Sequence, residues 1–151
     1  MKKEKCHKCK KPVLRNKIYE KNAGTFHKYC WEKWKIKKLR KEVDKTWQLK
    51  GLEYWGRKCI CGKYAPYCHH FFFKNTYPNT RYDIDNAVPI CPYCHTYIHS
   101  QDPKVFDDKI KEHRGEEWYQ RLKSKATDKK LPLKNISYYK KVEINLKSIK
   151  K

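Results

Sequence analysis

The clearest pattern along the chain is a series of apolar positions at helical spacing between Trp31 and Gly51. Lys and Arg occupy the other faces of this segment, which predicts a basic amphipathic helix. The apolar positions are Trp31, Trp34, Leu39, Val43 and Trp47, and the basic ones are Lys35, Lys37, Lys38, Arg40, Lys41 and Lys45. Direct contact with phosphates and a merely solvated cationic face explain these cations equally well.

The last third of the chain predicts three more helices. Residues 102–115 begin with Asp102-Pro103, an N-cap followed by proline at the first helical position, and end at a glycine. Residues 116–126 carry apolar side chains at helical spacing. The third helix is predicted by the spacing of Tyr139, Val142, Leu146 and Ile149, although the alternation of Val142, Ile144 and Leu146 also fits a strand.

Short strands are predicted in two places. Near the N-terminus, the alternating apolar residues that favour a hairpin are Val13, Leu14, Ile18 and Tyr19. Further along, His69 and His70 lie in a second predicted strand. Together with the helices, these strands predict a small α+β protein whose thin apolar core needs metal ions for stability.

Charge narrows the range of partners. The 151 residues include 38 Lys+Arg against 16 Asp+Glu, a formal net charge of +22. Residues 1–58 carry +14, residues 59–106 carry +1 and residues 107–151 carry +7. So much uncompensated cation predicts a polyanionic partner, with nucleic acid favoured over an anionic membrane.

Hydropathy predicts a soluble, intracellular protein. No run of about 18 apolar residues is present, and the segment Met1–Lys5 lacks the apolar stretch of a signal peptide. In a reducing compartment, the eight cysteines indicate metal ligands before disulfides.

The first cysteine cluster has the spacing C-x2-C-x17-H-x2-C. Its members are Cys6, Cys9, His27 and Cys30. Two short chelating pairs separated by a loop can build a tetrahedral Zn²⁺ shell, and this spacing resembles one finger of a LIM-type module. His7 is the spare residue, which we interpret as a solvated neighbour.

A second structural zinc site is predicted around Cys91-x2-Cys94. The partner pair expected upstream is Cys59-x-Cys61, one residue shorter than the usual C-x2-C. We expect Cys59 and Cys61 to be ligands, with Cys68 as the alternative. If it is not a ligand, Cys68 is a small buried residue beside the strand.

Four histidines surround this cysteine motif. His95 and His99 are four residues apart, so on a helix both imidazoles face one way and can share a metal ion. His69 and His70 are adjacent in a strand, so their side chains leave opposite faces. One of them can bind a metal ion while the other acts as a base.

The order His69-His70, then Asn86, then His95 and His99 behind a C-x2-C motif resembles the HNH, or ββα-metal, nucleases. Residues 59–100 carry this resemblance. It implies that His69 joins His95 and His99 on a catalytic divalent ion, and that His70 takes a proton from the attacking water.

The resemblance also implies that Asn86 orients the general base, as an amide that does not titrate. Arg81 is a candidate phosphate clamp, with an ordinary loop cation as an equally good alternative. Three imidazoles suit Zn²⁺, Ni²⁺, Co²⁺ or Mn²⁺ better than Mg²⁺ as the catalytic ion.

The order of parts is similar to the phage NinG (Rap) recombination endonucleases, which cut branched DNA such as D-loops and Holliday junctions. This resemblance implies DNA as partner, the cytoplasm of a bacterium or virus-infected cell as location, and a possible homodimer if cuts are paired. Two alternatives remain open. One is an HNH homing, restriction or defence nuclease on duplex DNA, and the other is a non-catalytic zinc-finger DNA-binding protein.

The predicted organisation has four parts. They are a zinc finger (1–31), a basic linking helix (32–58), an HNH core (59–101) and a helical C-terminal extension (102–151).

Overall fold

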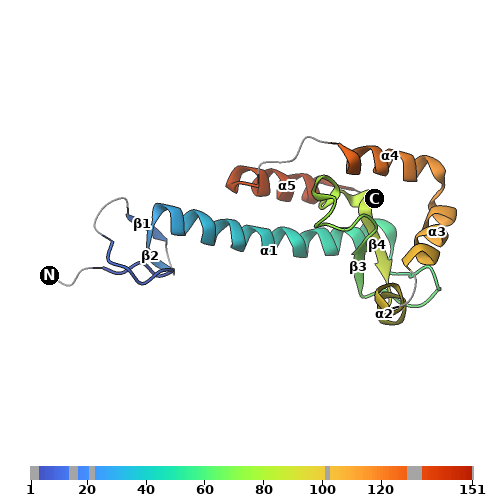
Figure 1. Cartoon of the computed structure of the whole chain (residues 1–151), viewed down its shortest axis with the longest axis horizontal. Coiled ribbons are helices and arrows are strands. Elements are labelled where there is room, and N and C mark those ends of the chain that lie inside the picture. Colours follow the sequence, from blue (N-terminus) through green and yellow to red (C-terminus); the bar gives the residue numbers. More distant parts are fainter. Residues whose placement is uncertain (1–3, 14–16, 21–22, 101–102, 129–133, 151) are drawn as a thin grey trace.

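One long helix, α1 (Lys28–Trp55), runs through the molecule and carries a small zinc-finger-like hairpin at one end and a strand–strand–helix unit at the other (Figure 1). Its 28 residues give it a length of about 42 Å. The computed structural model describes residues 4–13, 17–20, 23–100, 103–128 and 134–150.

The elements around α1 are short. At its N-terminal end lie β1 (Lys17–Glu20) and β2 (Gly24–His27), which pair antiparallel. At its C-terminal end lie β3 (Tyr67–His70), the single turns η1 (Pro78–Thr80) and η2 (Ile84–Asn86), β4 (Ala87–Ile90) and α2 (Pro92–Ser100). Three helices complete the described chain: α3 (Pro103–Arg114), α4 (Glu116–Thr127) and α5 (Ile136–Ser148).

The helices predicted from periodicity are confirmed, including the last one, for which a strand was the alternative. Within the part of the chain that the structure describes, the architecture is therefore a small α+β fold. Leu14 and the N-cap candidate Asp102 lie outside the described residues.

The long helix runs one turn past the apolar pattern that extends from Trp31 to Gly51. Gly51 does not stop α1, which continues to Trp55 and ends at Gly56, whose φ is +82°. Gly51 instead lets α1 approach the hairpin closely. A Cβ placed there would lie 2.8 Å from both the Ala87 Cβ and the Cys68 Sγ.

The hairpin of β3 and β4 is antiparallel, with His69 opposite Val88 and His70 opposite Ala87. All four residues of β4 are buried. Helix α1 covers one side of this hairpin, and α2 follows directly after β4. Apart from the two single turns, these elements follow one another as strand, strand, helix, the ββα order that the resemblance implies for residues 59–101.

Two hydrophobic clusters connect the regions that the sequence divides into linking helix, core and extension. One joins Phe71, Val88 and Ile90 of the hairpin region to Phe106 of α3 and Leu122 of α4. The other joins α1, the hairpin region and α5, and its main members are Leu39, Val43, Trp47, Cys68, Tyr82, Ala87, Tyr139 and Leu146. The predicted boundaries at residues 58 and 101 therefore do not separate hydrophobic cores.

The finger at the other end of α1 has its own small core of Cys6, Val13 and Phe26. Phe26 packs on Trp34 of α1, with ring centroids 5.3 Å apart. No helix in the described part of the chain is both long and apolar enough to cross a bilayer.

Candidate metal centres and histidine site

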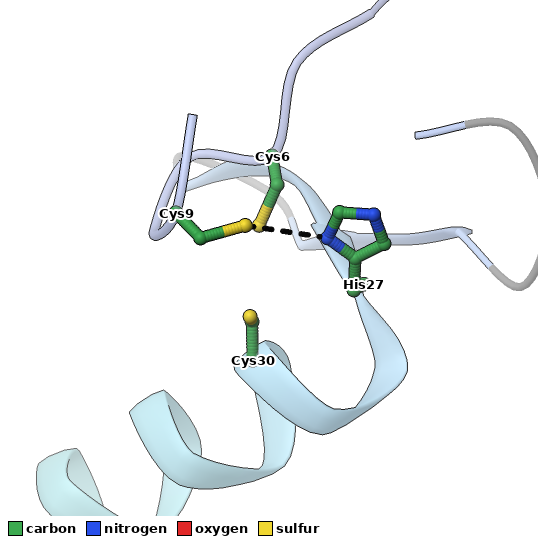
Figure 2. A group of neighbouring side chains, drawn as sticks. All are labelled: Cys6, Cys9, His27 and Cys30. Carbon is green, nitrogen blue, oxygen red and sulfur yellow. Dashed lines mark hydrogen bonds between the residues drawn. The ribbon is translucent and has the colours of Figure 1, made fainter. Parts of the chain in front are cut away.

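The first predicted zinc site comes together at the start of α1. Its four ligand atoms, from Cys6, Cys9, His27 and Cys30, all lie within 4.8 Å of one another. Figure 2 shows these side chains converging, with Cys30 projecting from the first turn of the helix. The Cys9 Sγ and His27 Nδ1 are 3.5 Å apart.

The orientation of His27 is fixed by its other ring nitrogen. Nε2 lies 3.2 Å from the carbonyl oxygen of Pro12, which can only accept, so Nε2 carries the proton. Nδ1 is then left with its lone pair directed at the three sulfurs. A backbone carbonyl in this role is the usual outer partner of a metal-binding histidine.

The protonation of the thiols in this cluster is uneven. Burial raises the pKa of Cys6, but backbone N–H donors of Cys9, His27 and Lys8 outweigh it and lower the value to about 6. The pKa of Cys30 rises to about 11, through burial and the neighbouring thiols of Cys9 and Cys6. Several thiolates crowded into one site repel one another, and a bound cation relieves that repulsion.

The second cluster forms in the ββα unit from Cys59, Cys61, Cys91 and Cys94, whose sulfurs also lie within 4.8 Å of one another. The Sγ atoms of Cys61 and Cys91 are 3.6 Å apart. The loop of Cys59 and Cys61 turns at Gly62, with φ +86° and an N–H that donates to the Cys59 carbonyl. That turn brings both sulfurs to the site despite the short C-x-C spacing.

Cys68, the alternative ligand, is not part of this cluster. It is buried, and its Sγ is near the Gln48 carbonyl at 3.9 Å. Burial raises the pKa of its thiol to about 12, which keeps it protonated. The expected ligand pair, Cys59 and Cys61, is therefore the one that the fold assembles.

Both clusters fit a zinc ion. A Zn–S bond of about 2.3 Å places two thiolates of one tetrahedral shell about 3.8 Å apart. The 3.6 Å between the Cys61 and Cys91 sulfurs is close to that edge, as is the 3.5 Å between Cys9 Sγ and His27 Nδ1. Each cluster can hold a structural metal ion such as Zn²⁺.

The two adjacent histidines of β3 occupy opposite faces of the hairpin, as predicted from strand geometry. On one face, the His69 ring lies 5.4 Å from the His95 ring of α2. Tyr67, two residues before His69, also contacts His95, at 5.4 Å between ring centroids. His99 is in α2, but its side chain lies outside the described residues.

On the other face, His70 is held by α1 and by the loop before β4. Its ring stacks on the indole of Trp47, with centroids 3.9 Å apart and planes 10° from parallel. Its Nε2 lies 3.0 Å from the carbonyl oxygen of Arg81, which makes Nε2 the protonated nitrogen and Nδ1 the acceptor. Burial lowers the pKa of His70 to about 4, so the ring is neutral near pH 7.

Asn86 is fully buried and fastens the loop between the two strands. Its Oδ1 accepts from the Phe72 N–H at 2.7 Å, and its Nδ2 donates to the carbonyls of Phe72 and Thr80 at 3.0 Å each. No described hydrogen bond joins Asn86 to His70 directly. Asn86 instead holds the carbonyl of Thr80. The next residue, Arg81, has the backbone carbonyl that accepts the hydrogen bond from His70 Nε2.

Arg81, predicted as either a phosphate clamp or a loop cation, is buried in the structure. The residue is 5% exposed, and its Nη2 donates to both carboxylate oxygens of Asp44, at 2.9 and 3.0 Å. A side chain buried in this pairing does not reach a phosphate at the surface. Through this ion pair, Arg81 connects the loop to α1.

Sequence reasoning missed the contribution of α1 to this site. Asp44, Trp47, Gln48 and Trp55 lie on one face of the helix and bond the hairpin region through side chains. Gln48 both donates to and accepts from the Cys68 backbone, at 2.8 and 2.7 Å. The only signal was the helical spacing of the tryptophans, which does not say what they pack against.

Helix α1 also carries the predicted DNA-contacting cations. Lys37, Lys38, Arg40, Lys41 and Lys45 are exposed, and Lys35 is half-buried. The Lys38 ammonium lies 5.5 Å from the Trp34 ring centroid. Arg40 lies on the same face as Asp44, with its Nε 4.0 Å from Asp44 Oδ2, and the cations on the other faces form a solvent-facing basic surface.

No family model matches this chain, and neither a curated protein nor a solved structure matches it. Statements about its activity therefore rest on its own residues and their geometry.

Proposed function

We propose that this protein is a metal-dependent DNA endonuclease with an HNH-type site. The observation that carries the proposal is the pairing of His69 with His95 across the hairpin and α2, 5.4 Å apart, in a unit of ββα order stapled by four cysteines. A structural zinc site needs neither histidine, because the four cysteines already complete its shell.

In this proposal His69, His95 and His99 hold the catalytic divalent ion. The described part supports this proposal, since two imidazoles from different elements, β3 and α2, meet edge to face with ring centroids 5.4 Å apart. The ion would stabilise negative charge on the scissile phosphate and on the departing 3′ oxygen. Imidazole ligands favour Zn²⁺, Ni²⁺, Co²⁺ or Mn²⁺ over Mg²⁺.

His70 is proposed as the general base. The bond from its Nε2 to the Arg81 carbonyl leaves Nδ1 as the proton acceptor. Burial lowers its pKa to about 4, which keeps the imidazole neutral at pH 7 and makes it a weaker base than an unperturbed histidine. Asn86 supports it through the loop, by holding the Thr80 carbonyl beside Arg81.

DNA is the proposed partner because of the charge distribution. The net charge is +14 over residues 1–58 and +1 over residues 59–106, so the basic surface lies outside the histidine site. Exposed cations on α1 would neutralise backbone phosphates without reading sequence. Branched recombination intermediates are the preferred substrate, by the resemblance to NinG nucleases, and duplex DNA is the alternative.

The test is a cleavage assay with purified full-length protein on linear duplex, flap and four-way junction DNA. Mn²⁺, Ni²⁺, Co²⁺, Zn²⁺ and Mg²⁺ are supplied in separate reactions. We expect 5′-phosphate and 3′-hydroxyl products, with the junction cut faster than the duplex. Cutting of the duplex alone would support the homing, restriction or defence alternative, and no cutting with any metal would overturn the enzyme proposal.

A second candidate is a non-catalytic zinc-stabilised DNA-binding protein. The observation in its favour is the stacking of His70 on Trp47 at 3.9 Å, because a purely structural histidine also packs in this way. This candidate predicts salt-dependent binding to all three DNAs without cleavage of any of them.

A further inference from the structure

Helix α1 contacts the His70 site through a single set of side chains. The members, all on one helical face, are Asp44, Trp47, Gln48 and Trp55. None of them belongs to the ββα unit. Gln48 contacts β3, and the other three contact the loop 81–84. Helix α1 therefore forms one side of the His70 site, and it does not only connect that site to the finger.

The loop 81–84 is fixed at several consecutive residues. Asp44 accepts from the Arg81 guanidinium at 2.9 and 3.0 Å and from the Tyr82 hydroxyl at 2.9 Å. Two indole N–H groups then donate to backbone carbonyls, Trp47 to Asp83 at 3.0 Å and Trp55 to Ile84 at 2.8 Å.

This loop matters because it carries the carbonyl that fixes the His70 ring. The Arg81 oxygen, 3.0 Å from Nε2, selects the tautomer with the proton on Nε2. Trp47 sets the plane of the same ring by stacking 10° from parallel. The position of the Arg81 oxygen and the plane of the imidazole are therefore both determined by α1.

Resting on the proposed nuclease function, we propose that Asp44 and Trp47 are positioning residues for His70. Asp44 acts through Arg81. It holds the Arg81 side chain, and the Arg81 backbone carbonyl accepts the hydrogen bond from His70 Nε2. Trp47 acts through the stacked ring. Both direct the His70 Nδ1 lone pair, without themselves touching substrate.

Two substitutions and one control test this role in the full-length, zinc-loaded protein. Asp44→Asn removes the negative charge that pairs with Arg81. Arg81→Lys keeps the charge and the backbone carbonyl but cannot reproduce the guanidinium geometry. Glu42→Gln is the matched control, because it removes an equal charge from an exposed position of the same helix.

The first readout is the ¹⁵N NMR signature of the His70 imidazole, which reports its tautomer without any need for activity. We expect one tautomer, protonated at Nε2, in the wild type and in Glu42→Gln. In Asp44→Asn and Arg81→Lys we expect a mixture of tautomers. An unchanged tautomer in both folded variants would overturn the proposal.

Asp44→Asn leaves a buried guanidinium without its counter-charge, so this variant carries a risk of unfolding. Circular dichroism and a zinc content of two per chain establish which variants are folded. If Asp44→Asn unfolds, Arg81→Lys together with Trp47→Phe decides the question. Trp47→Phe keeps an aromatic face but loses the N–H bond to Asp83, and a single unchanged tautomer in both would overturn the proposal.

The second readout is kinetic. We expect kcat for DNA cleavage to fall about 10-fold or more in Arg81→Lys with KM unchanged, because a misplaced base loses reactivity but not substrate binding. If the wild type cuts no DNA, the nuclease proposal fails, while the tautomer measurement still decides whether α1 positions His70. A rise in KM with kcat unchanged would contradict the positioning role.

Discussion

The two ends of α1 hold four-ligand clusters of similar size in very different surroundings. Each cluster has one exposed cysteine, Cys9 or Cys61. At the finger end, one ligand, Cys6, is buried, and it belongs to a core with only Val13 and Phe26. At the hairpin end, two ligands, Cys59 and Cys91, are buried in a larger cluster that includes Val88, Ile90 and Leu122. A metal ion bound at each cluster would therefore stabilise a local module at one end and the main core at the other.

The largest expected effect comes from Cys91→Ser. Zinc binding free energy is folding free energy for such sites, about 10 kcal/mol in zinc-finger peptides, which is comparable to the whole stability of a domain. We expect loss of the cooperative unfolding transition and a drop from two zinc ions per chain to one or fewer. Thermal unfolding with metal analysis measures both, and an unchanged melting temperature would contradict the comparison.

The close packing at the hairpin end predicts the next effect. Gly51→Ala places a Cβ 2.8 Å from the Ala87 Cβ and the Cys68 Sγ. Although alanine favours a helix, we expect destabilisation of about 1–3 kcal/mol from overpacking. Urea unfolding measures it, with Leu49→Ala at a 45% exposed position of the same helix as control. A stabilised Gly51→Ala would mean that the helix does not approach the hairpin this closely.

Acid should weaken the hairpin end through His70. Burial lowers its folded pKa to about 4, below the unfolded value of about 6.5, so the unfolded state binds more protons between these values. Stability is then lost as the pH falls from about 6.5 towards 4, by about 1–2 kcal/mol between pH 7 and pH 5. Comparison with His70→Asn isolates this loss, because acid protonates the thiolates of both proteins alike. Parallel pH profiles for the two proteins would refute it.

The smallest effect on the stability of the main core is expected from a substitution in the finger. Cys9→Ser should lower the zinc content from two to one and disorder the finger, because Cys6, Val13 and Phe26 bury little surface without the ion. The main transition should shift by less than about 1 kcal/mol, because α1 remains held by the hairpin and α5. Hydrogen exchange resolved along the chain distinguishes this local loss from global unfolding.

The sequence predicted much of the architecture because the decisive patterns are local. Helical periodicity without internal proline marked α1, and short Cys and His spacings marked both clusters. At Gly51 the pattern is ambiguous, since a glycine that ends a helix and one that permits close packing look the same in the sequence. Only the neighbouring Ala87 and Cys68 separate the two interpretations.

What the sequence did not reveal are long-range pairings. Asp44 and Arg81 are 37 residues apart, and no local pattern marks them as partners. Arg81 therefore looked like a surface cation, and Asp44 like one acidic residue in a basic helix. The orientation of His70 likewise depends on a carbonyl and an indole from segments that only the fold brings together.

The most direct test of the proposed function compares wild type with His70→Ala on a four-way junction. Cleavage is followed with Mn²⁺ present, and binding is followed by fluorescence anisotropy. The account predicts that His70→Ala lowers cleavage by about 100-fold or more, as loss of a general base does, while binding and zinc content stay unchanged. Equal cleavage by both proteins, or a parallel loss of binding, would contradict the assignment of His70 as the base.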